Sequence, residues 1–600
     1  MRHLISVLAI TVAAVALSSC DSPPTQTETE RFNTFLDERF DAWVSRSPTW
    51  QSYLGIKDDY DKWDDHSPER LDENLDFARK TIADIDAFDF AALDHQAQLS
   101  YRLYKDDMEN ILEAERYRYY GYQVNQMFGA QSDVPAFLIN IHRVDTVEDA
   151  EAYVARLNGI PQNFGYTMDF MRKGQEMGIL PPKFVFAHVL RDIDNVLTGR
   201  PYDNSDEDTA LLADFRKKVG ELEIADDEKA GLIARAEQAL LESVAPAYAA
   251  LKKLVLEQQA LANTDDGAWK HPDGDDYYRY QLQEITTTDL TADEIHDLGL
   301  AEVARIHDEM RGIMAQVEFE GDLQAFFTFM REDDQFFYPN TEEGRDAYLQ
   351  KTDTLIADMK TRLDGAFATL PKADLLVKPV EAFREQSAGK AFYQSPSPDG
   401  TRPGTYYVNL YDMADMAVYE LDALAYHEAI PGHHMQIAIA QELEGIPKFR
   451  RYGGYTAYIE GWGLYSEYLP KEMGLYQDPY ADFGRLSMEL WRACRLVVDT
   501  GLHDKRWTRE QAIQYLQDNT PAPEAESVKS IERYIVMPGQ ATAYKIGMLK
   551  ILELRSEAEE ALGDAFDIRA FHDVVLASGA LPLDILESQV RDWIAEANGS

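Results

Sequence analysis

The chain has 600 residues, of which 45% are hydrophobic and 27% are charged, a balance typical of a folded globular protein. Its formal net charge is −48 at pH 7, so it would repel the phosphates of a nucleic acid, and we expect no nucleic-acid partner. The length is sufficient for one large domain or several ordinary ones.

The first twenty residues, MRHLISVLAITVAAVALSSC, combine a basic start, an apolar run and small residues before Cys20. This pattern is typical of a secretory signal, and the apolar run is shorter than the ~20 residues that a membrane-spanning helix needs. The ending resembles a bacterial lipobox, which predicts that residues 1–20 are a lipoprotein signal peptide and that a lipidated Cys20 anchors the protein. An ordinary secreted protein is the alternative.

Residues 21–30 are polar and contain two prolines, so we expect a flexible tether between the anchor and the folded part. The protein would then be exported and lipid-anchored to the bacterial cell envelope, facing the periplasm or the outer surface. Cys494 is the only other cysteine in the sequence, and a lipidated Cys20 cannot pair with it. No internal disulfide is therefore expected.

Most of the chain after the tether has the apolar periodicity of helices. Residues 290–314, LTADEIHDLGLAEVARIHDEMRGIM, begin with a predicted capping box formed by Thr291 and Glu294. Gly501 is predicted to end a helix that precedes it.

Strand signals are few. Two segments rich in aromatic and β-branched residues predict strands, KFVFAHVL at 183–190 and GTYYVNLYDM at 404–413. The polar stretch 263–276 predicts a boundary between an N-terminal helical part, about 31–265, and a motif-bearing part, about 275–600.

Residues 426–436, YHEAIPGHHMQ, place three histidines and a glutamate within eight residues. The zinc-protease motif H-E-x-x-H would have its second histidine where this chain has a proline. In a straight helix, His427 would lie about 9 Å from His433 and about 10 Å from His434 along the axis, too far to share one metal ion. A shared ion requires a bend, which Pro431-Gly432 permits. The alternative is a hydrogen-bonded histidine group without metal.

A second motif follows in GGYTAYIEGWGLYSEYL, where Glu460 and Glu467 lie seven residues apart on one face of a predicted helix. A catalytic zinc ion usually has three protein ligands, and the string IEGW resembles the NEGF segment of zinc aminopeptidases, whose glutamate binds the metal. Gly461 and Gly463 would let this helix approach the first one closely. The alternative is that both glutamates lie on a solvated helix face.

Four segments in order resemble the bacterial domain-of-unknown-function family 885, which is grouped with the gluzincin-type metallopeptidases. They are YHEAIPGHHMQ, YIEGWGLYSE, WRACRLVVDTGLH with WTREQAI, and MPGQATAYKIG. The resemblance covers nearly all of the chain after the tether. It implies a mainly α fold with a small β-sheet beside the active-site helices, in a gluzincin-like architecture whose large helical scaffold surrounds a central cleft.

The resemblance implies a ligand set for one zinc ion. His427 would be the first ligand. His433 would be the second, because Gly432-His433 resembles the G-H ending of other gluzincin motifs, and His434 is the alternative. Glu460 would be the third ligand. Nitrogen-rich sites also accept other first-row metals.

The resemblance also implies two supporting roles. Glu467 would position a ligand histidine. Glu428 would be the general base, which takes a proton from water and passes it to the leaving amine.

Four further residues are candidates for the same site. Tyr544 and His503 could donate a hydrogen bond to the oxyanion of the reaction, although a tyrosine is more often a packing residue and a histidine also suits a helix C-terminus. Lys545 is a candidate for attracting a substrate carboxylate, with a surface position as the alternative. Asn409 would line the site if its strand holds an extended substrate by edge pairing.

The sequence therefore predicts a lipid-anchored, zinc-dependent peptidase of the bacterial envelope that acts on peptide substrates. One alternative is a metal-dependent amide hydrolase acting on a non-peptide substrate. Another is a non-catalytic binding lipoprotein with a vestigial site. The presence of Glu428 argues against the second alternative, since a decayed enzyme has no need of its base.

Overall fold

The structure is a computed structural model that describes residues 26–380, 385, 388–398 and 402–599. The predicted signal peptide, Cys20 and residues 21–25 of the tether lie outside these described residues. Helix α1 (Glu28–Val44) begins inside the predicted tether, because Thr27 and Glu30 form a capping box there. The prediction of a tether up to residue 30 is therefore wrong for its last three residues.

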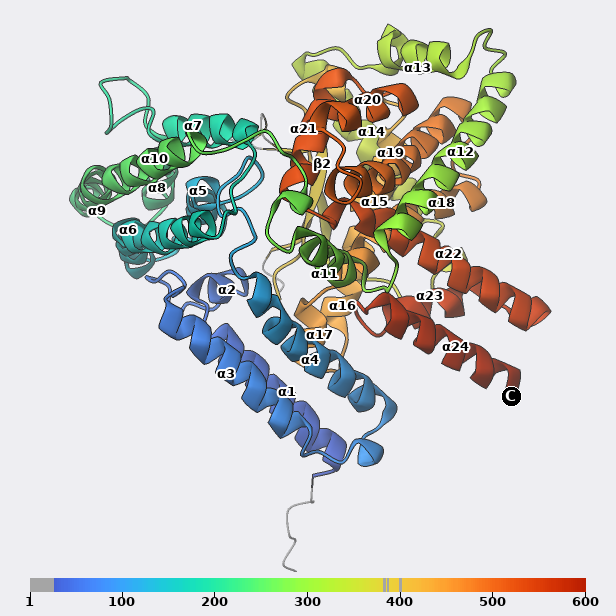
Figure 1. Cartoon of the computed structure of the whole chain (residues 1–600), viewed down its shortest axis with the longest axis horizontal. Helices are drawn as coiled ribbons and strands as arrows, with labels where there is room; N and C mark the ends of the chain where they lie inside the picture. Colours follow the sequence, from blue (N-terminus) through green and yellow to red (C-terminus); the bar gives the residue numbers. More distant parts are fainter. Residues whose placement is uncertain (1–25, 381–384, 386–387, 399–401, 600) are drawn as a thin grey trace, which may run out of the picture.

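The N-terminal part is built from helices, coloured blue to green in Figure 1. Helices α1, α3 and α4 pack side by side, and α5 to α10 form a second group of packed helices. The bounds of the helices after α1 are α2 (Pro48–Tyr53), α3 (Pro68–Ile85), α4 (His95–Ala114), α5 (Ala130–Asn140), α6 (Val147–Glu176), α7 (Lys183–Val196), α8 (Ala210–Gly220), α9 (Asp226–Ala239) and α10 (Ala245–Gln259).

The strand predicted at 183–190 is wrong, because these residues form the start of α7. The buried residues Val185, Phe186, Val189 and Ile193 recur at helical spacing, so the apolar run packs as one helix face. A short apolar run fits both periods, and this one forms a helix that packs against α5 and α10.

The C-terminal part contains the remaining helices and a three-stranded sheet. Its helices are α11 (Gly274–Thr286), α12 (Ala292–Gln316), α13 (Leu323–Glu332), α14 (Glu342–Lys360), α15 (Leu421–Glu428), α16 (His433–Glu442), α17 (Lys448–Tyr452), α18 (Thr456–Glu472), α19 (Pro479–His503), α20 (Arg509–Asn519), α21 (Glu524–Val536), α22 (Ala543–Leu562), α23 (Ile568–Leu576) and α24 (Leu583–Gly599). The predicted capping box of Thr291 and Glu294 is confirmed at the start of α12.

The sheet has the strand order β1-β3-β2, with β3 (Gly404–Val408) at its centre. Strand β1 (Leu375–Pro379) is parallel to β3, and β2 (Ala391–Gln394) is antiparallel to it. The strand predicted at 404–413 is thus confirmed for its first half. The sheet contacts α15 and α16, as the family resemblance implied.

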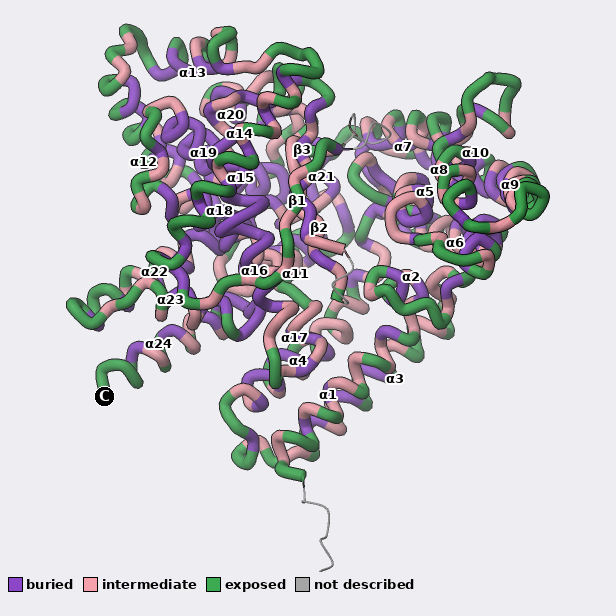
Figure 2. The backbone as a smooth tube through the Cα atoms, turned by 180° about the vertical axis from the view of Figure 1, so that it is seen from behind, coloured by how far each residue is buried: buried purple, intermediate pink, exposed green. Residues whose placement is uncertain are grey.

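The centre of the C-terminal part is formed by α15, α18 and α19, where the buried residues of Figure 2 are densest. Every residue of α15 is buried, and so is every residue from Ala481 to His503 except Trp491 and Arg492.

Gly501 lies inside α19, so the predicted helix stop is wrong. A Cβ atom there would lie 2.6 Å from the Trp507 ring, so this glycine makes room for an indole.

One cluster of buried hydrophobic residues extends from Phe32 in the N-terminal part to Ile594 in the C-terminal part. The two parts predicted on either side of 263–276 therefore share a core. Within the described part of the chain, no helix combines the length and the apolar character needed to span a membrane.

Candidate metal centre

The chain bends between the two parts of the histidine motif. Helix α15 ends at Glu428 and α16 begins at His433, so the bend that a shared ion requires is present between them. A Cβ atom on Gly432 would lie 1.8 Å from the carbonyl oxygen of His427, so only glycine fits this tight turn. The bend brings the His427 and His433 rings together, with their centroids 4.6 Å apart.

Glu460 of α18 completes a three-residue group with these histidines. Its Oε2 lies 3.6 Å from Nε2 of His427 and 3.5 Å from Nε2 of His433. Ligands that sit ~2.1 Å from a tetrahedral zinc ion are roughly 3.4 Å apart, close to both distances. Two imidazole nitrogens and a carboxylate oxygen are also the donor types that catalytic zinc uses. The residues present therefore fit a zinc ion.

Glu467 holds His427 from the other side. Its Oε1 lies 2.8 Å from Nδ1 of His427, and its side chain is only 1% exposed. This contact fixes the ring so that Nε2 faces Glu460. Arg492 of α19 lies behind it, with Nη2 3.6 Å from the same carboxylate oxygen of Glu467.

The charges of the group are strongly coupled. Burial opposes a charged His427, but contacts with Glu460 and Glu467 raise its pKa to about 10. Burial would also raise the pKa of Glu460, but the two histidines hold it well below its usual range. The space between these side chains thus stabilises positive charge, which is what a divalent cation would supply.

Glu428 lies next to His427 in sequence and is 7% exposed. Burial raises the pKa of its carboxyl, while His427 and His433 oppose the rise. A carboxyl with a raised pKa can both accept and release a proton closer to neutral pH than an ordinary glutamate.

The two glycines of α18 make room for different neighbours. A Cβ atom on Gly463 would lie 2.7 Å from the His427 ring, so this position lets α18 approach the motif, as predicted. Gly461 instead faces α22, where a Cβ atom would lie 2.5 Å from the backbone of Gly547. The prediction that Gly461 serves the approach to α15 is therefore wrong.

His434 points away from the three-residue group. Its Nδ1 lies 2.9 Å from the Tyr393 hydroxyl on β2, and its Nε2 lies 3.1 Å from the carbonyl oxygen of Ala373. Burial lowers the pKa of His434 to about 4. Both ring nitrogens of His434 therefore contact residues of the sheet region. Of the two histidines considered as the second ligand, only His433 lies beside Glu460.

Two candidates for substrate contact have structural partners instead. Lys545 is fully buried, with its Nζ 2.6 Å from Glu489 and 2.8 Å from Glu302, so it cannot reach a substrate. Asn409 donates hydrogen bonds to three backbone carbonyls of the loop before β2. It follows β3, which is paired on both sides, so the predicted edge pairing is not possible there.

His503 is also fully buried. Its Nδ1 accepts a hydrogen bond from the Ala268 backbone at 3.0 Å, and its Nε2 lies 3.0 Å from the carbonyl oxygen of Tyr534. Burial lowers its pKa to about 4. With both nitrogens used in this way, the predicted catalytic role of His503 is wrong.

Tyr544 is the oxyanion candidate that lies beside charged groups. It is 7% exposed, and three arginines surround it. Sequence reasoning missed these arginines, which are Arg492, Arg495 and Arg533. Two of them, Arg492 and Arg495, interrupt the apolar pattern of WRACRLVVDTGLH, and this interruption is the feature of the sequence that points to them.

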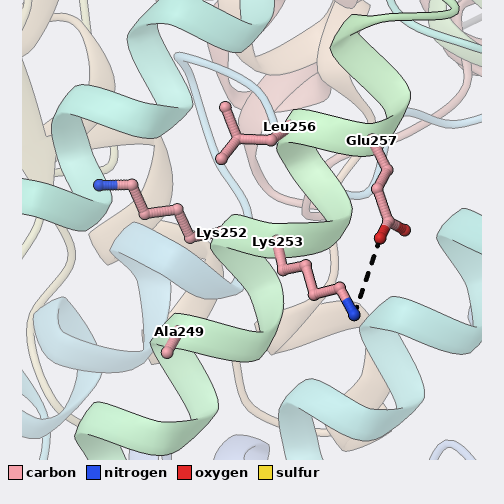
Figure 3. Close-up of a pocket in the computed structure, with 5 residues that line it drawn as sticks. All are labelled: Ala249, Lys252, Lys253, Leu256 and Glu257. Atoms are coloured by element: carbon pink, nitrogen blue, oxygen red, sulfur yellow. Dashed lines mark ion pairs between the residues drawn. The ribbon is translucent and has the colours of Figure 1, made fainter.

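A surface pocket lies far from this group. It is a depression of about 450 Å³ on α10, lined by Ala249, Lys252, Lys253, Leu256 and Glu257 (Figure 3). In Figure 3 the two lysines project from the helix, and Lys253 pairs with Glu257. The side chains belong to a single helix, so this pocket is a feature of the surface and not of the motif.

The fold and the site together define a mainly helical protein in which two buried histidines and the partly exposed Glu460 form a group beside Glu428 and a set of arginines. Residues 48–590 match the family of bacterial proteins of unknown function called DUF885. The chain belongs to this family.

The solved structures that are similar to this one include two lipoprotein candidates. A protein of Colwellia psychrerythraea, described as a candidate lipoprotein, is 31% identical and has a TM-score of 0.88, with 95% of this chain and 100% of that chain covered. A candidate lipoprotein of unknown function from Shewanella oneidensis is 19% identical and has a TM-score of 0.71, covering 93% of this chain and 99% of that one. The second likeness concerns the fold alone. No curated protein matches the chain.

Proposed function

We propose that this chain is a zinc-dependent peptidase of the bacterial envelope that hydrolyses peptide bonds with Glu428 as the general base. The observation that carries the proposal is the position of Glu460 Oε2, 3.6 Å and 3.5 Å from one nitrogen of His427 and of His433. His427, His433 and Glu460 would hold the ion.

A zinc ion in such a site polarises a carbonyl group and makes water acidic near neutral pH. Glu428 would accept the proton of the attacking water and deliver it to the leaving amine, a use that its raised pKa favours. Glu467 would keep His427 oriented through the 2.8 Å contact. Tyr544, surrounded by arginines, is the donor we assign to the developing oxyanion.

The envelope location rests on the leader sequence. Cys20 would carry the lipid, and the description of the Colwellia psychrerythraea protein as a candidate lipoprotein supports this assignment. The anchored protein would face the periplasm or the outer surface. The gluzincin-like architecture and the central cleft belong to the same proposal.

The test combines elemental analysis with a peptide-cleavage assay on the purified protein. Near-stoichiometric zinc is expected, and Glu428→Gln should keep the zinc while losing about 10²–10⁴-fold in cleavage rate. Glu444→Gln, in an exposed loop after α16, is the matched control and should cleave normally.

Three other outcomes would decide against the proposal. Absence of metal after incubation with zinc would contradict any metal-dependent hydrolysis. Turnover of only non-peptide amides would identify the other hydrolase alternative. Bound zinc with no turnover of either substrate type would favour a binding lipoprotein.

A further inference from the structure

Three arginines converge on the Tyr544 side chain. The Arg495 guanidinium carbon lies 4.5 Å from the centroid of the Tyr544 ring, and that of Arg492 lies 5.8 Å from it. Nη2 of Arg533 lies 3.4 Å from the Tyr544 hydroxyl. Arg492 and Arg495 come from α19 and Arg533 comes from α21, so two helices direct positive charge at one point.

Each of these arginines has a buried guanidinium nitrogen without a hydrogen-bond partner among the described residues, and in Arg492 this atom is Nε. Arg495 is 8% exposed, and its Nε donates to the Tyr534 hydroxyl, but its Nη1 is buried and has no hydrogen-bond partner among the described residues. Arg533 donates from Nη2 to Gln540, and its Nε is likewise buried and unpartnered there. Within the described part of the chain, neither guanidinium lies within 4.0 Å of a carboxylate oxygen.

Buried arginines of this chain differ in how many of their guanidinium nitrogens have a partner, and Nε of the buried Arg450 is unpartnered among the described residues as well. The chain has 106 acidic and 58 basic residues, so carboxylates are abundant. Arg156, a fully buried arginine that also lacks a carboxylate partner, uses all three of its guanidinium nitrogens for hydrogen bonds. Leaving a buried guanidinium nitrogen without a partner costs free energy that Arg156 avoids. Arg495 and Arg533 do not avoid this cost, and the described part of the chain places no carboxylate beside either of them.

The arginines lie next to the candidate metal centre. Arg492 is 3.6 Å from Glu467, the carboxylate that contacts His427. Burial opposes the charge on Arg533, but nearby tyrosines and Glu460 raise its pKa. Arg492 therefore contacts the partner of His427, and Arg533 is close enough to Glu460 for the charge of that carboxylate to raise its pKa.

We propose that Arg495 and Arg533 bind a carboxylate of the substrate, so that the site selects peptides with a free carboxylate near the bond to be cleaved. This inference rests on the proposed function for the identity of the substrate as a peptide. The guanidinium fork matches a carboxylate with two parallel hydrogen bonds, and the unpartnered nitrogens supply the donors. Arg492 contributes charge, while its contact with Glu467 fixes it in place.

The carboxylate has two sources in a peptide, the C-terminus and an acidic side chain. Three probes distinguish them, namely N-acetyl-Ala-Ala, its C-terminal amide, and N-acetyl-Ala-Asp amide. Their affinities would be measured by calorimetry, once with the protein stripped of metal by a chelator and once with zinc-loaded Glu428→Gln, which holds the probes without cleaving them.

We expect the free acid to bind at least about tenfold more tightly than the plain amide, in the stripped protein as well as in the loaded one. Arg495→Gln and Arg533→Gln should each remove most of this difference. Arg591→Gln is the matched control, because Arg591 pairs with Glu557 and Glu587 on the surface of the protein and should leave the difference intact. Tight binding of the Asp amide would assign the carboxylate to a side chain.

Equal affinity for the free acid and both amides would overturn the inference. The comparison on the unaltered protein remains decisive if an arginine variant fails to fold. If the protein binds no zinc, the proposed function fails, while preference of the stripped protein for the free acid still supports the arginine site. If it binds zinc and cleaves acid and amide peptides equally, only the arginine site fails.

Discussion

Nε1 of Trp462 donates a hydrogen bond to the carbonyl oxygen of Pro431 at a distance of 2.8 Å. The indole is fully buried, and it belongs to α18, two residues after Glu460. The helix that carries the third candidate ligand is therefore bonded directly to the turn that brings the two histidines together.

Replacing Trp462 with phenylalanine should loosen the centre. The Pro431 carbonyl would lose its donor in a buried place, which lowers the free energy of unfolding by about 1–3 kcal/mol. Zinc affinity should fall as well, because the turn is no longer tied to α18. Urea unfolding and zinc titration measure the two effects. Trp593→Phe, a partly buried tryptophan on α24, is the control that should not change zinc affinity.

Gly463→Ala should damage zinc binding while the fold survives. The added methyl group would lie 2.7 Å from the His427 ring, so either the ring or α18 must shift. We expect zinc affinity to fall by at least about tenfold, in line with the effect of displaced partners at metal sites. Gly231→Ala adds the same methyl group to helix α9, where nothing lies within 4 Å. Unchanged zinc affinity in Gly463→Ala would contradict the ligand role of His427.

His433→Ala and His434→Ala should have different effects. The first should remove bound zinc, because only His433 lies beside Glu460. The second should keep the zinc and lose about 1–3 kcal/mol of stability, because Tyr393 and Ala373 lose their partner. Elemental analysis and urea unfolding of both variants measure this difference. Loss of zinc in His434→Ala alone would require a different ligand set.

Asp499 should make stability depend on pH. It is fully buried, and burial raises its pKa to about 7 despite hydrogen bonds from Tyr278 and Gly539. The folded state therefore holds a proton that the unfolded state has lost, so this group costs stability as pH rises from about 4 through 7.

The cost over that range is roughly 4 kcal/mol at one such site, from 1.36 kcal/mol per pKa unit. Asp499→Asn should remove this fall, so the variant should gain stability over the unaltered protein at pH 8 and not at pH 4. The urea midpoint at several pH values measures this. Parallel profiles for the two proteins would show that Asp499 does not carry the effect.

Predictions from the sequence were correct where the structure of a segment depends on residues close together in that segment. The capping box of Thr291 fixed a helix start, and the distance between His427 and His433 in a straight helix required a bend that the structure contains. Predictions were wrong where the structure of a segment depends on contacts with residues from distant parts of the chain. KFVFAHVL was predicted as a strand but forms the start of α7, and Gly501 makes room for Trp507 without ending a helix.

The same limit applies to the candidate site. Lys545 and His503 have the residue types of catalytic groups, but their partners Glu489 and Tyr534 come from other segments and bury them. Local sequence could not reveal those contacts. Arg492 and Arg495 are visible as interruptions of an apolar pattern, but the pattern alone does not show that they face Tyr544.

The contacts that hold the three-residue group are all made by the protein itself. Glu467 orients His427, and Trp462 fixes the turn before His433. For the proposed zinc peptidase, we therefore expect folding to come first and metal uptake second. An exported chain without metal would complete its fold and acquire the proposed ion from its surroundings afterwards. A chelator would accordingly return it to a folded, reloadable form.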